Sequence, residues 1–197
     1  MRVQALPLSI ALGLLLVAVL AVGVITTQNV LKAGDLSLTC AGGEGVAGSV
    51  DTTDARIAGY SGEQLTNAAH IIDAGIAMGL PRDAQEIAVM TAMGESALQI
   101  LDYGDTAGPD SRGLFQQRGS GAWGSYEDRM DPVISATNFY RALTNNVPEW
   151  PSLAPSDAAH RVQRNADPRH YERWESAADE VVLTLTAQAQ TCTSTEG

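Results

Sequence analysis

The chain has 197 residues, of which 45% are hydrophobic, so it is long enough to fold around one ordinary core. Its formal net charge of −11 argues against nucleic acid as a partner, because phosphate binding needs clustered Lys and Arg. The two cysteines lie far apart and form no CxxC motif, so the sequence contains no cysteine-based metal pattern, and we expect no metal and no cofactor.

An uncharged, strongly apolar stretch opens the chain, from Val3 to Leu31. It contains LPLSIALGLLLVAVLAVGVI, which is about the length needed to cross the hydrocarbon core of a bilayer. We therefore predict a transmembrane signal-anchor over residues 1–32, with the functional domain on the far side of the cell membrane from the cytoplasm. A cleaved signal peptide, which would leave a secreted protein, is the alternative; its apolar region is usually shorter, and no clear small-x-small cleavage site follows here.

A segment rich in Gly, Ala and Asp comes next, and it indicates a flexible linker over residues 33–60. Cys40 in this segment and Cys192 near the C-terminus lie at opposite ends of the part that follows the anchor. In an oxidising compartment the two would form a disulfide that ties the first and last segments together, worth about 3–5 kcal/mol in the chain-entropy model. Two unpaired thiols are the alternative.

Helical signals dominate the rest of the chain, which we assign to one domain over residues 61–192 with a short tail at 193–197. A predicted capping box of Ser61 and Gln64 opens the first helix. Because no segment shows strict alternation of apolar and polar residues, the predicted fold class is all-α. The expected helices span 61–79, 83–101, a segment that starts from the cap Asp131 and Pro132, 156–166 and 168–190.

Glu95 is the only charged residue between Ile87 and Leu101, on a helix whose other residues favour burial. A carboxyl group at the border of an apolar stripe is partly desolvated, and desolvation favours the neutral acid. An acid that keeps its proton near neutral pH can donate it to a leaving-group oxygen. The small neighbours Gly94 and Ser96 would leave room for a bulky substrate; alternatively, Glu95 points into solvent at a helix end.

Two adjacent amides, Gln116 and Gln117, follow a loop rich in Gly and Asp, in the segment SRGLFQQR. An amide side chain offers both a donor and an acceptor, which suits sugar hydroxyls and N-acetyl groups. Ordinary surface polarity is the alternative for such a pair.

Together these segments resemble the motifs of the lysozyme-like lytic transglycosylases, a superfamily that includes the goose-type lysozymes. ES at 95–96 is similar to the family's E-S, and GLFQ at 113–116 is similar to its G-L-M-Q. QRNADP at 163–168 is similar to the third motif, A-Y-N-A-G-P, except that Arg164 replaces the tyrosine and Asp167 the glycine. The wider pattern also looks like the wall-active domains of actinobacterial secreted and conjugation proteins.

The resemblance implies a lysozyme-like helical domain that cleaves peptidoglycan between N-acetylmuramic acid and N-acetylglucosamine. Glu95 would act as general acid and then as base, while the muramoyl 6-hydroxyl closes on its own anomeric carbon to give a 1,6-anhydro product. One essential carboxylate would then be enough, whereas most glycosidases pair two. Ser96 would orient the acid and also contact the substrate, and Gln116 would contact the sugar beside the cleaved bond.

Two other readings stay open. If Asp102, Asp105 or Asp110 lies across a cleft from Glu95, water could attack instead, as in a goose-type lysozyme; ordinary turn chemistry is the alternative for these aspartates. The domain could also hold glycan strands without cutting them, as a scaffold among envelope-assembly proteins of a secretion or conjugation system. The loss of the family's tyrosine at Arg164 mildly favours this scaffold.

Four further residues are candidate substrate contacts. Trp123 would stack on a sugar ring or else hold its loop onto the core. Tyr140, on the apolar face of its helix, belongs either to the core or, by the resemblance, to the cleft. Gln163, together with Arg164 beside it, would line the cleft floor, and Gln117 would join Gln116 in contacting the glycan.

Overall fold

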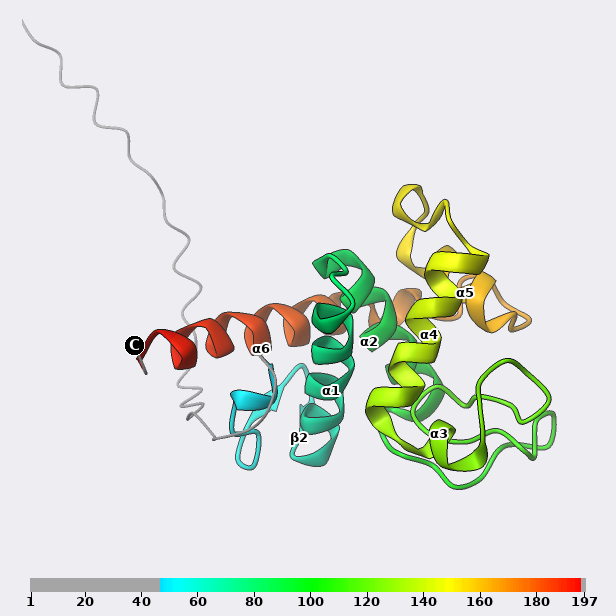
Figure 1. Ribbon diagram of the computed structural model, residues 1–197, viewed down its shortest axis with the longest axis horizontal. Helices are drawn as coiled ribbons and strands as arrows, with labels where there is room; N and C mark the ends of the chain where they lie inside the picture. The colour runs from blue at the N-terminus through cyan, green and yellow to red at the C-terminus, as the bar shows by residue number, and fades with distance from the viewer. Residues whose placement is uncertain (1–46, 196–197) are drawn as a thin grey trace, which may run out of the picture. The chain divides into compact units, whose positions relative to one another are not determined.

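The chain divides into two units, Met1–Gly34 and Asp35–Gly197. The computed structural model describes residues 47–195, all of which belong to the second unit (Figure 1). The predicted transmembrane segment, 1–32, and the first part of the predicted linker, 33–46, lie outside the described residues. Within residues 47–195, no helix combines the length and apolar character that crossing a bilayer requires.

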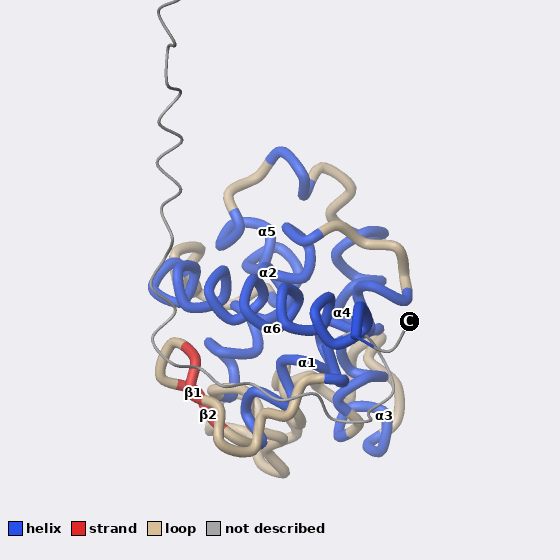
Figure 2. The backbone as a smooth tube through the Cα atoms, turned by 90° about the vertical axis from the view of Figure 1, so that its left-hand side faces the viewer, coloured by secondary structure: helices blue, strands red, loops and turns tan. Residues whose placement is uncertain are grey.

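The described residues are mostly helical, which confirms the all-α class (Figure 2). A small antiparallel hairpin pairs β1 (Arg56–Ile57) with β2 (Tyr60–Ser61). The helices are α1 (Glu63–Ala77), α2 (Arg82–Ser96), α3 (Tyr126–Met130), α4 (Pro132–Asn146), α5 (Pro155–Gln163) and α6 (Glu175–Thr195), with short 3₁₀ turns at Ala47–Ser49, Trp150–Ser152 and Glu172–Trp174.

Helix α1 packs against three other helices. It contacts α4 on one side and α2 and α6 on others, and α2 packs along α6 (Figure 1). The largest fully buried side chains include Tyr140, Tyr171, Phe115 and Phe139, and the rings of Phe115 and Phe139 stack with centroids 4.9 Å apart. Phe115 therefore anchors the loop before α3 to the core.

The region expected to be a linker is partly built into the domain. Ala47, Val50 and Ile57 are buried, and the 3₁₀ turn at its start packs on α1 and α6. The backbone amides of Ala47 and Gly48 donate to the carboxylate of Asp73 at 2.7 and 2.8 Å. The prediction of a flexible linker up to residue 60 is therefore wrong for residues 47–60, because isolated apolar side chains and a carboxylate on α1 fix a segment that has no periodicity of its own.

Helix α4 begins as predicted, and α1 does not. Asp131 caps α4 by accepting from the amides of Val133 and Ile134, each at 2.8 Å. At α1 the N-cap is Gly62 and no side-chain cap bond forms; Gln64 accepts from the Ser61 amide at 3.4 Å, so only half of the predicted capping box exists.

Helix α2 ends five residues earlier than predicted, at Ser96 instead of Leu101. Ala97 and Leu98 both adopt left-handed backbone conformations, with φ of 52° and 62°. Side chains from α1 bind the freed carbonyls: Gln64 Nε2 donates to Ala97 O at 2.8 Å, and Asn67 Nδ2 donates to Leu98 O at 2.9 Å. This ending puts Glu95 in the last turn of α2, next to the loop that follows.

The last predicted helix also starts later than expected. Residues 168–171 form a turn, a 3₁₀ turn follows, and α6 begins at Glu175 instead of Pro168. Tyr171 therefore projects from an irregular segment that packs against α2.

Candidate active site

Glu95 is half-buried in the last turn of α2, and it does not point freely into solvent. Its neighbour Gly94 has no side chain because Tyr171 and Trp174 occupy that space: a Cβ at position 94 would meet the Tyr171 ring at 2.7 Å and the Trp174 ring at 3.1 Å. The prediction that Gly94 leaves room for substrate is therefore wrong, since a tyrosine and a tryptophan fill the space beside it.

The hydroxyl of Tyr171 donates a hydrogen bond to Glu95 Oε1. Tyr171 is completely buried, and its pKa is raised by burial and by the neighbouring Glu95 charge, so its hydroxyl stays a donor. One carboxylate oxygen of Glu95 is thus held by a side chain 76 positions further along the chain. This contact fixes the orientation of the carboxyl group.

Burial raises the pKa of Glu95 above its ordinary value, and the negative charge of Asp105 raises it further. Hydrogen bonds from Tyr171 and Gln163 act in the opposite direction, because they stabilise the ionised form, but burial is the largest effect. Glu95 therefore retains its proton at higher pH than an exposed glutamate would.

Two substitutions should move the pKa of Glu95 in opposite directions. Tyr171→Phe removes a bond to the ionised form, so the pKa should rise; Asp105→Asn removes a nearby negative charge, so the pKa should fall. A ¹³C NMR titration of the Glu95 carboxyl carbon in the full-length chain measures both shifts. Shifts of the same sign would contradict this electrostatic picture.

The GLFQ segment forms a tight loop beside Glu95. Arg112 and Gln117 form an isolated antiparallel bridge, with N–O distances of 3.1 and 3.0 Å, and the four residues between them turn the chain. Gln116 adopts a left-handed conformation with φ of 47°, and its Nε2 donates to Gly113 O at 3.3 Å. Its side chain is half-buried and faces the same groove as Glu95.

Ser96 ties this loop to α2. Its hydroxyl is buried and bonds to Leu114 O at 2.8 Å and to Ala92 O at 3.0 Å. The hydroxyl is thus committed to backbone carbonyls, so the roles predicted for Ser96, orienting Glu95 and contacting substrate, do not match its position. Instead it holds the GLFQ loop against the helix that carries Glu95.

Gln117 is also mostly structural. It is 2% exposed, and its Nε2 donates to Ser135 O at 2.9 Å on α4. The buried guanidinium of Arg129 donates from Nη1 to Gln117 O at 3.0 Å and to Asp110 O at 2.7 Å. Arg129 therefore joins both ends of the loop to α3, and only the edge of Gln117 reaches the groove.

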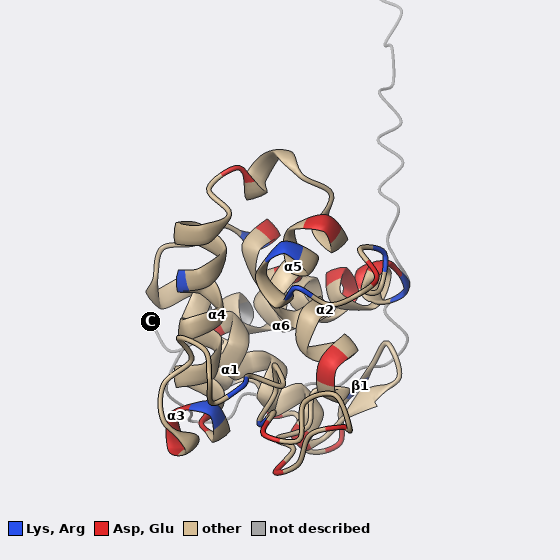
Figure 3. Cartoon of the chain, turned by 90° about the vertical axis from the view of Figure 1, so that its right-hand side faces the viewer, with Lys and Arg blue, Asp and Glu red and all other residues tan. Residues whose placement is uncertain are grey.

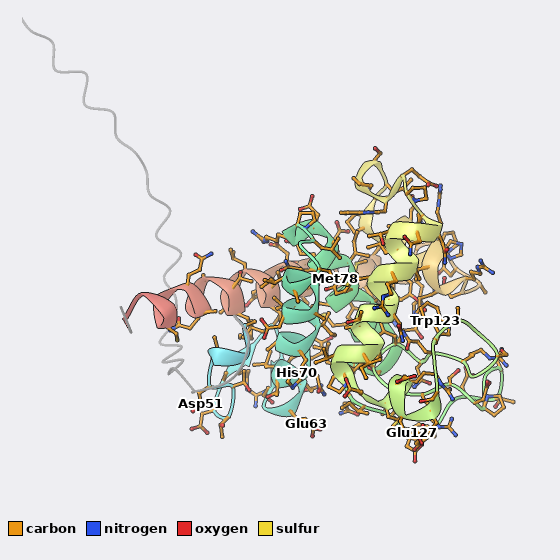
Figure 4. All side chains as sticks on the ribbon, in the orientation of Figure 1. Asp51, Glu63, His70, Met78, Trp123 and Glu127 are labelled. Carbon is orange, nitrogen blue, oxygen red and sulfur yellow. The ribbon has the colours of Figure 1, made fainter. Side chains whose placement is uncertain are left out.

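An open groove of about 580 Å³ brings most of the predicted residues together. Its lining comes from the end of α2, the loop after the GLFQ segment, one face of α4 and the end of α5. Figure 4 labels Trp123, which lies beside α4; its carbonyl accepts from Asn138 Nδ2 at 3.1 Å. The predicted residues that line the groove are Glu95, Gln116, Gln117, Trp123 and Gln163.

Trp123 and Gln163 both line the groove. Trp123 is half-buried: it packs against the core, as one of its two expected roles requires, and it also lines the groove. Gln163, the last residue of α5, donates from Nε2 to Phe115 O at 2.8 Å. It therefore connects α5 to the GLFQ loop beside Glu95.

Tyr140 does not reach the groove. It is completely buried, and its hydroxyl donates to Ile71 O on α1 at 2.9 Å. Its neighbour Phe139 is buried as well, whereas Asn138, Arg141 and Asn145 line the groove from the other face of α4. The cleft position that the resemblance implies for Tyr140 is therefore wrong, and the core alternative is right.

The three aspartates of the loop between the motifs behave differently. Asp102 pairs with Arg112 at 3.0 Å and accepts from Tyr126, and Asp110 pairs with Arg118 at 3.1 Å. Asp105 accepts from the Gly108 amide at 2.7 Å, as a turn residue does, and is also the one whose charge acts on Glu95.

Cys192 is buried in α6 and is disulfide-bonded. Its predicted partner, Cys40, lies outside the described residues, so the pairing stays a prediction. Among residues 47–195, no group of three or more His, Cys, Asp and Glu side chains is arranged to hold a metal ion.

Comparison with models of known protein families and with curated protein sequences finds no match.

Sequence reasoning missed several residues of this site. Tyr171 was counted as part of a long helix, although an aromatic residue close behind the imperfect third motif was a usable signal. Three of the arginines that line the groove, Arg118, Arg141 and Arg161, gave no signal, because they are scattered along the sequence; Arg164 was singled out as the residue that replaces the family's tyrosine.

Proposed function

We propose that the domain is a lysozyme-like glycosidase of the lytic transglycosylase type, which cleaves peptidoglycan strands with Glu95 as its general acid. The observation that carries the proposal is a half-buried carboxyl group with a raised pKa, lining an open groove together with Gln116 and Gln163. The groove also offers an indole, from Trp123, on which a sugar ring can stack.

In this mechanism, protonated Glu95 donates its proton to the oxygen between N-acetylmuramic acid and N-acetylglucosamine, and the glycosidic bond breaks. The muramoyl 6-hydroxyl bonds to its own anomeric carbon, and the Glu95 carboxylate accepts the proton which that hydroxyl loses. The product is a 1,6-anhydro sugar, and Glu95 returns to its protonated form. Tyr171 acts as a positioning residue, because its hydroxyl holds the carboxyl group.

The loss of the family's tyrosine at position 164 weakens this proposal less than the sequence indicated. Arg164 ends α5 in a left-handed conformation with φ of 56°. A tyrosine hydroxyl nevertheless reaches Glu95, from Tyr171. The site therefore does not lack the functional group that the third motif would have supplied.

Hydrolysis is the second candidate reaction, and Asp105 is the aspartate to test for it, because its negative charge is the one that acts on Glu95. In this reaction Asp105 would activate a water molecule, and the product would carry a reducing end. Asp105→Asn separates the two reactions. If Asp105 only raises the pKa of Glu95, the variant keeps its activity and the alkaline limb of kcat/KM moves to lower pH; if Asp105 activates water, activity is lost.

The direct test incubates the full-length chain, in mild detergent, with purified peptidoglycan and identifies the released fragments by mass spectrometry. Anhydro-muropeptides support the transglycosylase, and reducing-end products support the hydrolase. Binding without any released product would contradict both and would favour the glycan-holding scaffold. An enzyme of this type would act outside the cytoplasm, with residues 1–32 as its membrane anchor.

A further inference from the structure

The groove that contains Glu95 is basic, although the chain as a whole has a net charge of −11. Four arginines line it, whereas Glu95 is the only acidic residue in its lining. Figure 3 shows basic residues on α4 and around α5. When Glu95 is protonated, the groove carries only positive charge.

Two of the four arginines are neutralised by partners within the domain. Arg118 pairs with Asp110 at 3.1 Å, and Arg161 pairs with Glu149. These pairs are exposed, and they fix loop positions more than they attract a ligand.

The other two arginines, Arg141 on α4 and Arg164 after α5, have no acidic partner among residues 47–195. Arg141 Nη1 donates to Asn138 Oδ1 at 3.3 Å, which leaves most of its donors unused. Both side chains are exposed in the groove. An unneutralised guanidinium is a planar fork of donors whose geometry matches a carboxylate.

The chemistry around these two arginines suits a substituted glycan better than a long polyanion. Asn138, Asn145 and Asn165 line the same groove and can bind hydroxyl and amide groups. The acidic surface outside the groove would repel a polymer that carries a phosphate on every unit. A short substituent with one or two carboxylates keeps its charge within the groove.

We propose that Arg141 and Arg164 bind the free carboxylates of peptide stems on the glycan strand, so that the groove selects peptide-bearing strands over uncharged ones. This inference rests on the proposed function, because it names the substrate feature that the groove distinguishes. It makes the two arginines specificity-determining residues.

The test measures binding of full-length Glu95→Gln chain, which should hold strands without cutting them. The probes are peptide-bearing N-acetylglucosamine–N-acetylmuramic acid oligosaccharides and the same oligosaccharides with their carboxylates converted to amides. We expect Kd to be roughly fivefold higher for the amidated probe, because exposed charge pairs contribute under about 1 kcal/mol each. Adding Arg141→Gln and Arg164→Gln together should remove this difference.

The matched control is Arg56→Gln, which removes the same charge from an exposed position on β1, away from the groove lining. It should keep the fivefold discrimination. Far-UV circular dichroism and thermal midpoints check that all variants are folded. Equal affinity of the parent chain for both probes would overturn the inference, and so would equal loss of discrimination in the control.

Two further measurements complete the test. One distinguishes a carboxylate from a phosphodiester as the bound anion, and the other distinguishes failure of this inference from failure of the proposed function. In the first, poly(glycerol phosphate) competes with the peptide-bearing probe for the groove. If it displaces the probe at a concentration no higher than that of the probe itself, and only when both arginines are present, the arginines bind a phosphodiester and not a carboxylate. The inference is then wrong.

If the wild-type chain cuts native and amidated strands equally well, the inference fails while the proposed function stands. If the wild-type chain cuts neither, but binding still depends on carboxylates and on both arginines, the proposed function fails and the inference stands as a property of a binding groove.

Discussion

Glu95→Gln should lower the rate of product release from peptidoglycan by about 10³-fold, within the range that general acid catalysis contributes. Glutamine has the same shape as glutamic acid and can still accept the Tyr171 hydrogen bond, but it has no proton to donate at the reacting oxygen. Mass spectrometry of released fragments, with pull-down of the variant on insoluble peptidoglycan, separates lost chemistry from lost binding.

The matched control for this substitution is Glu180→Gln, which makes the same chemical change at an exposed position on α6. It should release product at the wild-type rate. A Glu95→Gln chain that released product as fast as this control would remove Glu95 from the mechanism.

The same variant tests the burial of Glu95 without any reference to activity. Because the folded-state pKa of Glu95 is raised, its contribution to stability is fully present below the unfolded-state pKa and is lost as the pH rises through the folded-state pKa. At alkaline pH the wild-type chain therefore holds a half-buried negative charge, which lowers its free energy of unfolding, and the glutamine variant holds none. The thermal midpoint of Glu95→Gln, relative to wild type, should be higher at pH 9 than at pH 4; no change with pH would contradict the raised pKa.

The sequence predicted those parts of the fold that local signals determine. The cap at Asp131 is a short-range hydrogen-bonding pattern, and it forms as expected. The end of α2 depends on Gln64 and Asn67, whose side chains bind carbonyls more than thirty positions away. No local sequence pattern could therefore predict where α2 ends. The same limit applies to residues 47–60, where burial comes from contacts with α1 and α6.

The candidate site shows the same difference between residues that the sequence identifies and residues whose roles depend on distant contacts. Glu95 was found because it stands out from its local sequence and Gln116 because GLFQ resembles a family motif, and both line the groove. Tyr171 was missed because its role comes from a contact with Glu95 across 76 positions. Tyr140 lies on an apolar helix face, and its spacing fits core and cleft equally well until the neighbouring helix is known; here α1 covers it.

Gly113→Ala should destabilise the domain by about 3–5 kcal/mol and should abolish activity, because the GLFQ loop cannot accommodate a side chain at its first position. Gly113 has φ of 71°, and a Cβ there would lie 1.9 Å from the carbonyl oxygen of Arg129. Neither partner can move away cheaply, since the Arg129 side chain donates to carbonyls at both ends of the same loop.

Gly79→Ala is the matched control, because it measures the cost of backbone strain without the steric clash that occurs at Gly113. Gly79 has nearly the same backbone angle, with φ of 69°, but a Cβ there would meet nothing within 4 Å. It should therefore cost only the left-handed strain, about 1–2 kcal/mol, and should leave the groove intact. Chemical denaturation of both full-length variants measures the difference in free energy of unfolding. If Gly113→Ala cost no more than Gly79→Ala, the GLFQ loop would not be pinned between α2 and α3, and the position of Gln116 beside Glu95 would lose its structural support.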